Sequence, residues 1–177
     1  MARTIATVIT VAVLLALLGL MLRSWRGRSR RDAALPAGYP LPIDAAGELV
    51  SAAVLYVATT LRARPLERLH IPGLGFRAWA RLTVTDAGVI LALAGEEAVF
   101  IPATAIAVLE DATVAIDRAV ETDGLLLLGW RLPGTSSQIV DSYFRILDPT
   151  DRVSVNDAIR TIAADALRPA ARDESEA

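Results

Sequence analysis

The chain has 177 residues, 54% of them hydrophobic, and its formal net charge of −2 is unevenly distributed. Residues 1–31 contain six arginines and no acidic residue, whereas residues 32–177 contain 12 arginines and 20 acidic residues, a balance of −8. The absence of cysteine excludes disulfides, thiol chemistry and thiolate-bound metals, and an acidic globular part lacks the basic surface that a nucleic-acid partner requires.

Residues 4–22 predict the first element, a transmembrane helix. This run of 19 residues has no charge, and at 1.5 Å per residue it would be about 28 Å long, close to the thickness of the hydrocarbon core of a bilayer. A cleaved signal peptide would have basic residues before a shorter apolar region and a small-residue cleavage site after it. Here the basic residues follow the run, so we expect an uncleaved anchor with Arg23, Trp25, Arg26 and Arg28 at the membrane interface.

The position of the arginines also predicts the orientation of the anchor. Only Arg3 precedes the apolar run, whereas five arginines follow it within residues 23–31. By the positive-inside rule, the amino terminus lies outside and the globular domain lies in the cytoplasm, attached to the inner (plasma) membrane.

Residues 23–44 are predicted to be a basic, proline-containing linker. The segment contains Pro36, Pro40 and Pro42 and has neither helical nor strand periodicity. A single domain is then predicted over residues 45–168, and residues 169–177 are predicted to be a disordered tail.

Short strand patterns separated by turns dominate the predicted domain. They lie at residues 54–59, 77–85, 89–93, 98–101, 106–109, 113–116, 125–132 and 139–147. Within residues 77–85, the alternation places Trp79, Arg81 and Thr83 on one face of the strand. This spacing of strands and turns is typical of a small antiparallel barrel or sandwich.

The periodicity becomes helical after residue 148. Asp148 and Pro149 form a helix-start signal. Val155, Ile159 and Ile162 then recur at helical spacing and form one apolar stripe. We expect this amphipathic helix to pack on the body of its own domain.

Several local sequences resemble those of a known family. Tyr56–Thr60 (YVATT), Gly73–Arg77 (GLGFR), Phe100–Pro102 (FIP) and Trp130–Arg131 are similar to segments of the actinobacterial PH-like (pleckstrin-homology-like) domain-containing single-pass membrane proteins. The resemblance covers roughly residues 4–167. It implies an N-terminal transmembrane helix followed by a PH-like antiparallel β-barrel closed by a C-terminal α-helix. It carries over no catalytic residue.

The residues of the chain offer little material for catalysis. His70 is the only histidine, so a multi-histidine metal site or a histidine-based relay with several members cannot be built. Gly73-Leu74-Gly75 lacks the remaining glycine and the strand–helix setting of a nucleotide-binding motif. Glu96 and Glu97 are adjacent and are interpreted as solvated turn residues. We therefore predict no enzyme, no catalytic residue, no cofactor and no metal.

One cluster of residue types could bind an anion. Arg62, Arg64, Arg68 and Arg77, with His70, lie in the connection between the first two predicted strands, and arginine forks suit phosphate. The leading hypothesis is a membrane-anchored, cytoplasmic, non-enzymatic protein-interaction or scaffold module with an unidentified protein partner. Its expected contact surface is an open strand edge or the groove beside the helix at residues 155–166. The alternatives are an anionic lipid-headgroup sensor that uses the arginine-rich segment 62–77, and an auxiliary subunit of a membrane transporter.

Overall fold

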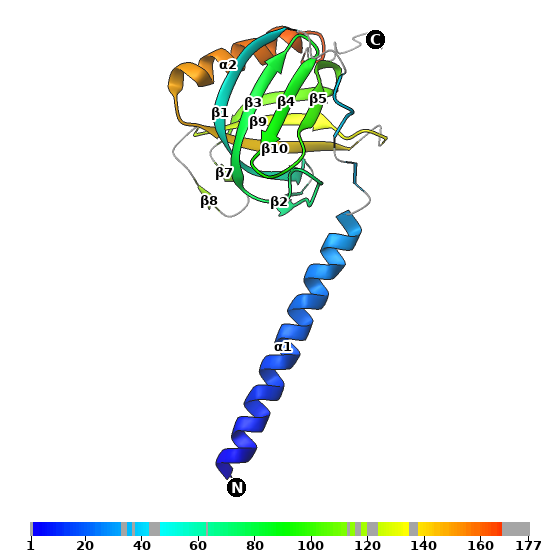
Figure 1. The fold of residues 1–177 in the computed structure, drawn as a ribbon, viewed down its shortest axis with the longest axis vertical. Coiled ribbons are helices and arrows are strands. Elements are labelled where there is room, and N and C mark those ends of the chain that lie inside the picture. Colours follow the sequence, from blue (N-terminus) through cyan, green and yellow to red (C-terminus); the bar gives the residue numbers. More distant parts are fainter. Residues whose placement is uncertain are drawn as a thin grey trace, which may run out of the picture. The chain divides into compact units, whose positions relative to one another are not determined.

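The computed structural model describes residues 2–32, 35–36, 38–42, 47–62, 64–112, 114–115, 118–119, 124–134 and 138–167. The chain divides into two compact units, Met1–Ala34 and Leu35–Ala177 (Figure 1). The predicted tail at 169–177 lies outside the described residues, as do the side chains of Trp25 and Arg28.

The first unit contains one long helix, α1 (Ala2–Asp32). Its window Thr7–Ser24 has a mean hydropathy of 2.1, and none of that window is buried, so by length and composition α1 could cross a membrane. The helix continues beyond the predicted span through Asp32. Residues 23–32, which the sequence assigns to a linker, are therefore helical.

The second unit is built on an eight-stranded antiparallel sheet. Seven of the described strands follow the order β5-β4-β3-β1-β10-β9-β6, and β2 pairs with β1 beside this path. Their bounds are β1 (Glu48–Leu61), β2 (Arg64–Arg68), β3 (Ala78–Thr85), β4 (Gly88–Leu93), β5 (Val99–Pro102), β6 (Ile106–Ala112), β9 (Leu125–Arg131) and β10 (Ile139–Ile146). A separate two-stranded sheet contains β7 (Val114–Ala115) and β8 (Arg118–Ala119).

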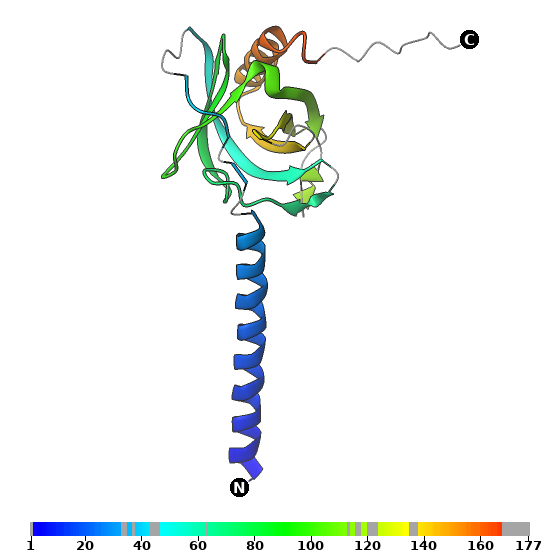
Figure 2. The same cartoon turned by 90° about the vertical axis from the view of Figure 1, so that its right-hand side faces the viewer.

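Strand β1 belongs to both halves of the curled sheet (Figures 1 and 2). It pairs with β3 from Glu48 to Tyr56 and with β10 from Val54 to Leu61, and an irregularity in the second ladder lies between Tyr56 and Ala58. Such irregularities bend a strand and increase its twist. The bend allows one long strand to connect β3, β4 and β5 with β10, β9 and β6.

The sheet is not closed as the predicted barrel. Its end strands β5 and β6 are joined by the 3₁₀ turn η1 (Ala103–Ala105), yet the described residues form no ladder between them. Strand β5 has four residues and ends at Pro102, which has no backbone N–H to donate. The turn then leads the chain into β6, which pairs with β9 instead.

Part of the predicted linker lies against the open edge of β5. The Tyr39 N–H donates to the Phe100 carbonyl oxygen at 3.0 Å, and the Tyr39 hydroxyl donates to the Arg131 carbonyl oxygen of β9 at 3.1 Å. Tyr39 and Leu35 also pack against the core. Gly38 has a φ of 96°, and a Cβ there would lie 2.6 Å from Val99 Cγ1. Tyr39 thus connects the end strand β5 with β9, the neighbour of the other end strand β6.

The C-terminal helix α2 (Pro149–Ile162) lies at one end of the curled sheet in both views (Figures 1 and 2). The Asp148 side chain caps it by accepting from the Thr150 and Asp151 N–H groups at 2.8 and 3.4 Å. Val155 and Ile159 are fully buried in the same core as the inward side chains of the strands. The predicted C-terminal amphipathic helix is confirmed.

Two local expectations require correction or restriction. The connection between the first two predicted strands contains an additional strand, β2, because Thr60 and Leu61 of β1 pair with Arg68 and Arg64. In the segment predicted as a strand at 113–116, Val114–Ala115 forms the short strand β7, and residues 113 and 116 lie outside the described residues.

Candidate interaction surface

The structure places the four predicted anion-binding arginines in different environments. Arg62 Nη1 donates to Asp141 Oδ1 at 3.1 Å, and its Nη2 lies 3.9 Å from Glu110 Oε2. Arg64 donates to Glu67 Oε2 at 3.2 Å. Two of the four guanidinium groups are therefore paired with carboxylates of the domain itself.

Arg68 and Arg77 differ from this pair and from each other. Arg68 donates to the carbonyl oxygens of Val57 at 2.5 Å and Gly75 at 3.4 Å, so it ties β2 to β1 and to the following loop. Arg77 is exposed and makes neither a hydrogen bond nor an ion pair within the described part of the chain. The four side chains thus do not converge on one site. Of the predicted membrane-interface residues whose side chains are described, Arg23 and Arg26 are exposed on α1.

A buried chain of hydroxyl groups crosses the interior of the domain. The Trp130 indole N–H donates to Ser142 Oγ at 3.0 Å, and Ser142 Oγ lies 2.8 Å from Thr59 Oγ1. Tyr56 Oη lies 2.9 Å from Thr59 Oγ1 and 2.8 Å from the Leu74 carbonyl oxygen. Because the indole can only donate and the carbonyl can only accept, these two ends fix the direction of hydrogen-bond donation through all three hydroxyl groups. Each hydroxyl is used once as donor and once as acceptor, which identifies a structural network.

Asp141 is a second buried polar group, on the strand that also carries Ser142. The residue is 5% exposed, and burial raises the pKa of its carboxyl group, while the charge of Arg62 partly opposes that shift. Its cross-strand neighbour Gly129 provides the necessary space, since a Cβ there would lie 2.9 Å from Asp141 Oδ1. The Asp141 carboxylate pairs with Arg62, whose guanidinium also lies near Glu110.

The residues whose side chains are of types common in catalysis, His70, Glu96 and Glu97, do not form a common site. His70 is half-buried, with its ring in an edge-on contact to Phe76 at a centroid distance of 6.1 Å. Glu96 and Glu97 are exposed in the turn between β4 and β5. No three His, Asp or Glu side chains among the described residues are grouped so that they could hold a metal ion.

An exposed tryptophan marks a surface that the sequence indicated only in part. Trp79 on β3 is 55% exposed. It lies opposite Leu55 of β1, which lies opposite Arg145 of β10 on its other side. One register step along, Arg81 lies between Ala53 of β1 and Ala92 of β4. Directly paired residues point to the same side of a sheet, so these side chains form one outward surface. We name it the tryptophan face: Ala53, Leu55, Trp79, Arg81, Ala92 and Arg145.

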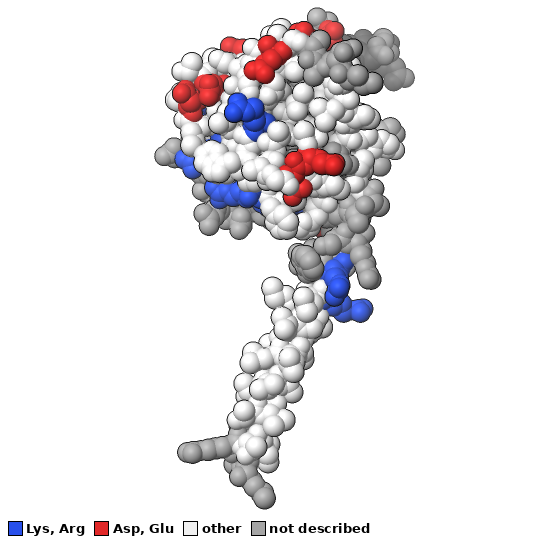
Figure 3. Space-filling view, viewed as in Figure 1, with Lys and Arg blue, Asp and Glu red and all other residues white. Residues whose placement is uncertain are grey.

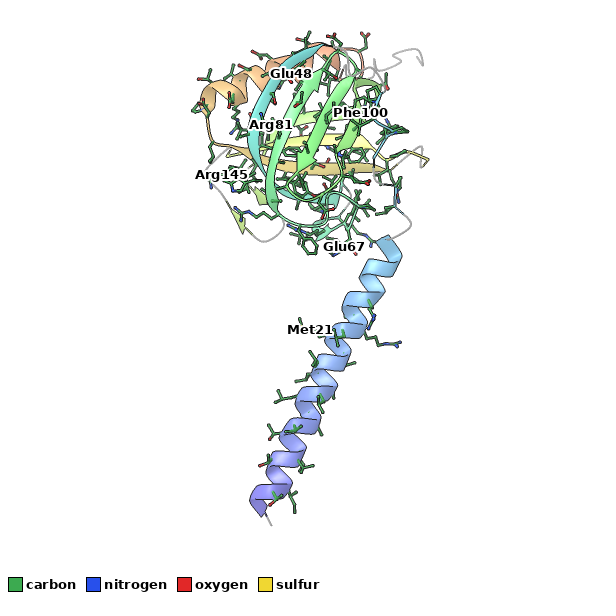
Figure 4. All side chains as sticks on the ribbon, viewed as in Figure 1. Met21, Glu48, Glu67, Arg81, Phe100 and Arg145 are labelled. Atoms are coloured by element: carbon green, nitrogen blue, oxygen red, sulfur yellow. The ribbon has the colours of Figure 1, made fainter. Side chains whose placement is uncertain are left out.

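The tryptophan face is a local basic area on an acidic domain. Within the described part of the chain, the Arg81 guanidinium hydrogen-bonds only to Ser51 Oγ, at 3.5 Å, and Arg145 makes neither a hydrogen bond nor an ion pair. Figure 3 shows basic and acidic atoms as separate patches on the viewed side, and Figure 4 labels Arg81 and Arg145 beside β1. Strand alternation in residues 77–85 indicated that Trp79 and Arg81 share a face. Arg145 could not be added without the pairing of β1 with β10.

The bent antiparallel sheet and its C-terminal helix define a PH-like domain, a class that generally serves as a non-catalytic interaction module. The family model described as bacterial PH domain-like matches residues 34–160, and the chain belongs to this family. Among solved structures, the chain is similar to the solution structure of the C-terminal phosphotyrosine interaction domain of APBB2 from mouse. The two share 12% identity with a TM-score of 0.48, and the match covers 76% of this chain and 97% of that one. The comparison with curated proteins found no match.

Proposed function

We propose that the protein is a single-pass membrane protein whose PH-like domain acts at the cytoplasmic face of the plasma membrane as a non-enzymatic protein-interaction module. The observation that carries this proposal is the uncovered apolar surface of α1. Large apolar side chains are exposed along residues 5–22 of the helix, from Ile5 through Leu14 to Met21. A helix that is apolar on every side and is not covered by its own protein requires an apolar environment.

The energetics favour a bilayer as that environment. Residues 4–22 contain six leucines, two isoleucines and three valines. Each contributes roughly −0.3 to −0.6 kcal/mol to insertion near the centre of a bilayer, so the helix gains several kcal/mol without an opposing charge. The arginines that follow the apolar window support a cytoplasmic position for the domain.

The short connection between helix and domain supports action close to the membrane. Helix α1 ends at Asp32, and the family match begins at residue 34. A domain attached in this way has a high effective concentration for partners in or near the same membrane. Arg62, Arg64 and Arg68 are not part of the proposal, because each already binds acceptors of its own domain.

Alkaline extraction of cell membranes tests the anchor. The wild-type chain is expected to remain in the membrane pellet. A chain with both Leu14→Arg and Leu15→Arg is expected in the soluble fraction, since each central arginine costs roughly 2.5–3.5 kcal/mol of insertion. The matched control is Leu147→Arg with Val153→Arg, two exposed apolar positions of the domain, and this variant is expected to pellet like wild type. A soluble wild-type chain, or a helix variant that pellets fully, would contradict the proposal.

A further inference from the structure

We propose that the tryptophan face binds an extended acidic segment of a protein partner, with an apolar side chain of that segment against Trp79 and its carboxylates on the surrounding arginines. This deepens the proposed function and rests on it for the cellular location of the partner. Binding at the face itself depends only on the folded domain.

The exposure of Trp79 is the first step of the argument. Trp79 is more than half exposed on a sheet face, opposite Leu55 and one register step from the exposed small residues Ala53 and Ala92. Tryptophan is enriched where proteins contact partners, because it buries a large apolar area with few rotatable bonds. A shallow groove of about 260 Å³ runs beside the indole and includes Ala53, Arg81 and Ala94 in its lining. The groove can receive one side chain or a narrow segment.

The charges around Trp79 determine the chemistry of the partner. Elsewhere in the domain Arg62, Arg64 and Arg152 all pair with carboxylates. Arg81, Arg145 and the nearby Arg77 have no carboxylate partner within the described residues. In a region with 20 acidic residues and 12 arginines, these cations form a basic area that is complementary to a carboxylate-bearing ligand.

Strand geometry gives the spacing of that ligand. Arg81 lies two residues after Trp79 on β3, and Arg77 lies two residues before it, immediately before the strand begins at Ala78. At about 3.3 Å per residue of extended chain, the two arginines are at most roughly 13 Å apart. Same-side side chains of an extended segment repeat about every 6.6 Å. An acidic residue two positions before and another two positions after an apolar residue therefore match Arg77, Trp79 and Arg81. Arg145, two strands away at about 10 Å, can take a further carboxylate.

The acidic turn beside the face favours a narrow segment over an anionic bilayer. The Ala94 N–H donates to the Trp79 carbonyl oxygen at 3.1 Å, and the exposed Glu96 and Glu97 follow in the same turn. A flat anionic surface that covered the whole face would also approach these carboxylates, which is unfavourable. A segment that runs over Leu55 of β1 and Trp79 of β3 approaches the arginines of the face without covering this turn.

Selection from a library of random short peptides tests the proposal on the full chain in phosphatidylcholine nanodiscs. Peptides that bind are expected to be enriched in the pattern acid-x-apolar-x-acid. Their affinity should fall about tenfold or more for a chain with both Arg81→Glu and Arg145→Glu, and also for Trp79→Ala. The matched charge control is Arg131→Glu with Arg160→Glu, two exposed arginines away from the face, and it should stay within about twofold of wild type.

Three results would overturn the proposal. These are selected peptides that lack acidic residues, peptide binding that is insensitive to charge reversal at Arg81 and Arg145, and a selection in which no peptide binds. Nanodiscs containing phosphatidylserine provide the bilayer arm: if only association with anionic lipid depends on the tryptophan face, the partner is a membrane surface and the peptide proposal is wrong. All variants should pellet like wild type after alkaline extraction, so failure of the face and failure of the anchor are distinguishable.

Discussion

Replacement of Gly88 by alanine tests the close approach of β4 to β5. A Cβ at Gly88 would lie 2.2 Å from the Ile101 carbonyl oxygen, 2.7 Å from Pro102 Cα and 3.0 Å from the Ala103 nitrogen. All three are backbone atoms, so no rotamer change can relieve the overlap. To reach ordinary contact, the two strands must separate by about 1 Å, which costs roughly 1–3 kcal/mol for overpacking and about 1 kcal/mol for each weakened hydrogen bond.

We expect Gly88→Ala to lower the free energy of unfolding by about 3–5 kcal/mol, a large share of the stability of a typical domain. The matched control is Gly95→Ala in the next turn. Both glycines have a positive φ, +155° at Gly88 and +85° at Gly95, but nothing lies within 4 Å of a Cβ added at Gly95. Its substitution therefore includes the backbone strain without the overlap and should cost about 1–2 kcal/mol. Urea unfolding of the full chain in detergent measures both, followed by tryptophan fluorescence, which changes as the fully buried Trp130 becomes exposed. Equal losses for the two variants would refute the reasoning.

The remaining predictions concern the edge of β5 and the buried polar groups. Gly38→Ala should cost about 1–3 kcal/mol, because its Cβ would overlap the Val99 side chain on β5, and limited proteolysis should then cleave near residue 40 sooner than in wild type. Ser142→Ala should cost about 2 kcal/mol in the same urea assay, since it leaves the Trp130 indole N–H buried without its acceptor. Because burial raises the pKa of the Asp141 carboxyl group, its contribution to stability is present at low pH and is lost as pH rises through the folded-state pKa. Arg62→Ala should raise that pKa further. The variant should lose about 1–2 kcal/mol of unfolding free energy at neutral pH, and this loss should shrink towards pH 3.8. An equal loss at both pH values would contradict the pairing of Arg62 with the Asp141 carboxylate.

Alternation and helical periodicity predicted most elements of the domain. The strands at 77–85 and 139–147 and the C-terminal helix follow from local patterns that the folded sheet uses directly. Strand β2 was missed because Arg64–Arg68 contains Pro65 and no β-branched residue, and because among the described strands it pairs only with β1. Local strand propensity does not predict a strand that forms through its pairing with β1 rather than through its own composition.

Features that depend on distant pairings could not be predicted. The proline-containing segment around Tyr39 has the composition of a linker, yet it contacts Phe100 and Arg131, far along the chain. The grouping of Arg62, Arg64 and Arg68 in sequence did not indicate that β10, β2 and β1 would supply separate acceptors. For the same reason, only the β3 half of the tryptophan face was visible in the sequence.

Membrane topology tests the central claim most directly. Because the chain has no cysteine, single cysteines can be introduced by Ala2→Cys before the apolar window and by Ser154→Cys on the exposed side of α2. A membrane-impermeant maleimide should label the first variant in intact cells and the second only after permeabilisation. Labelling of the Ser154→Cys variant in intact cells would contradict a cytoplasmic interaction domain held by a single membrane-spanning helix.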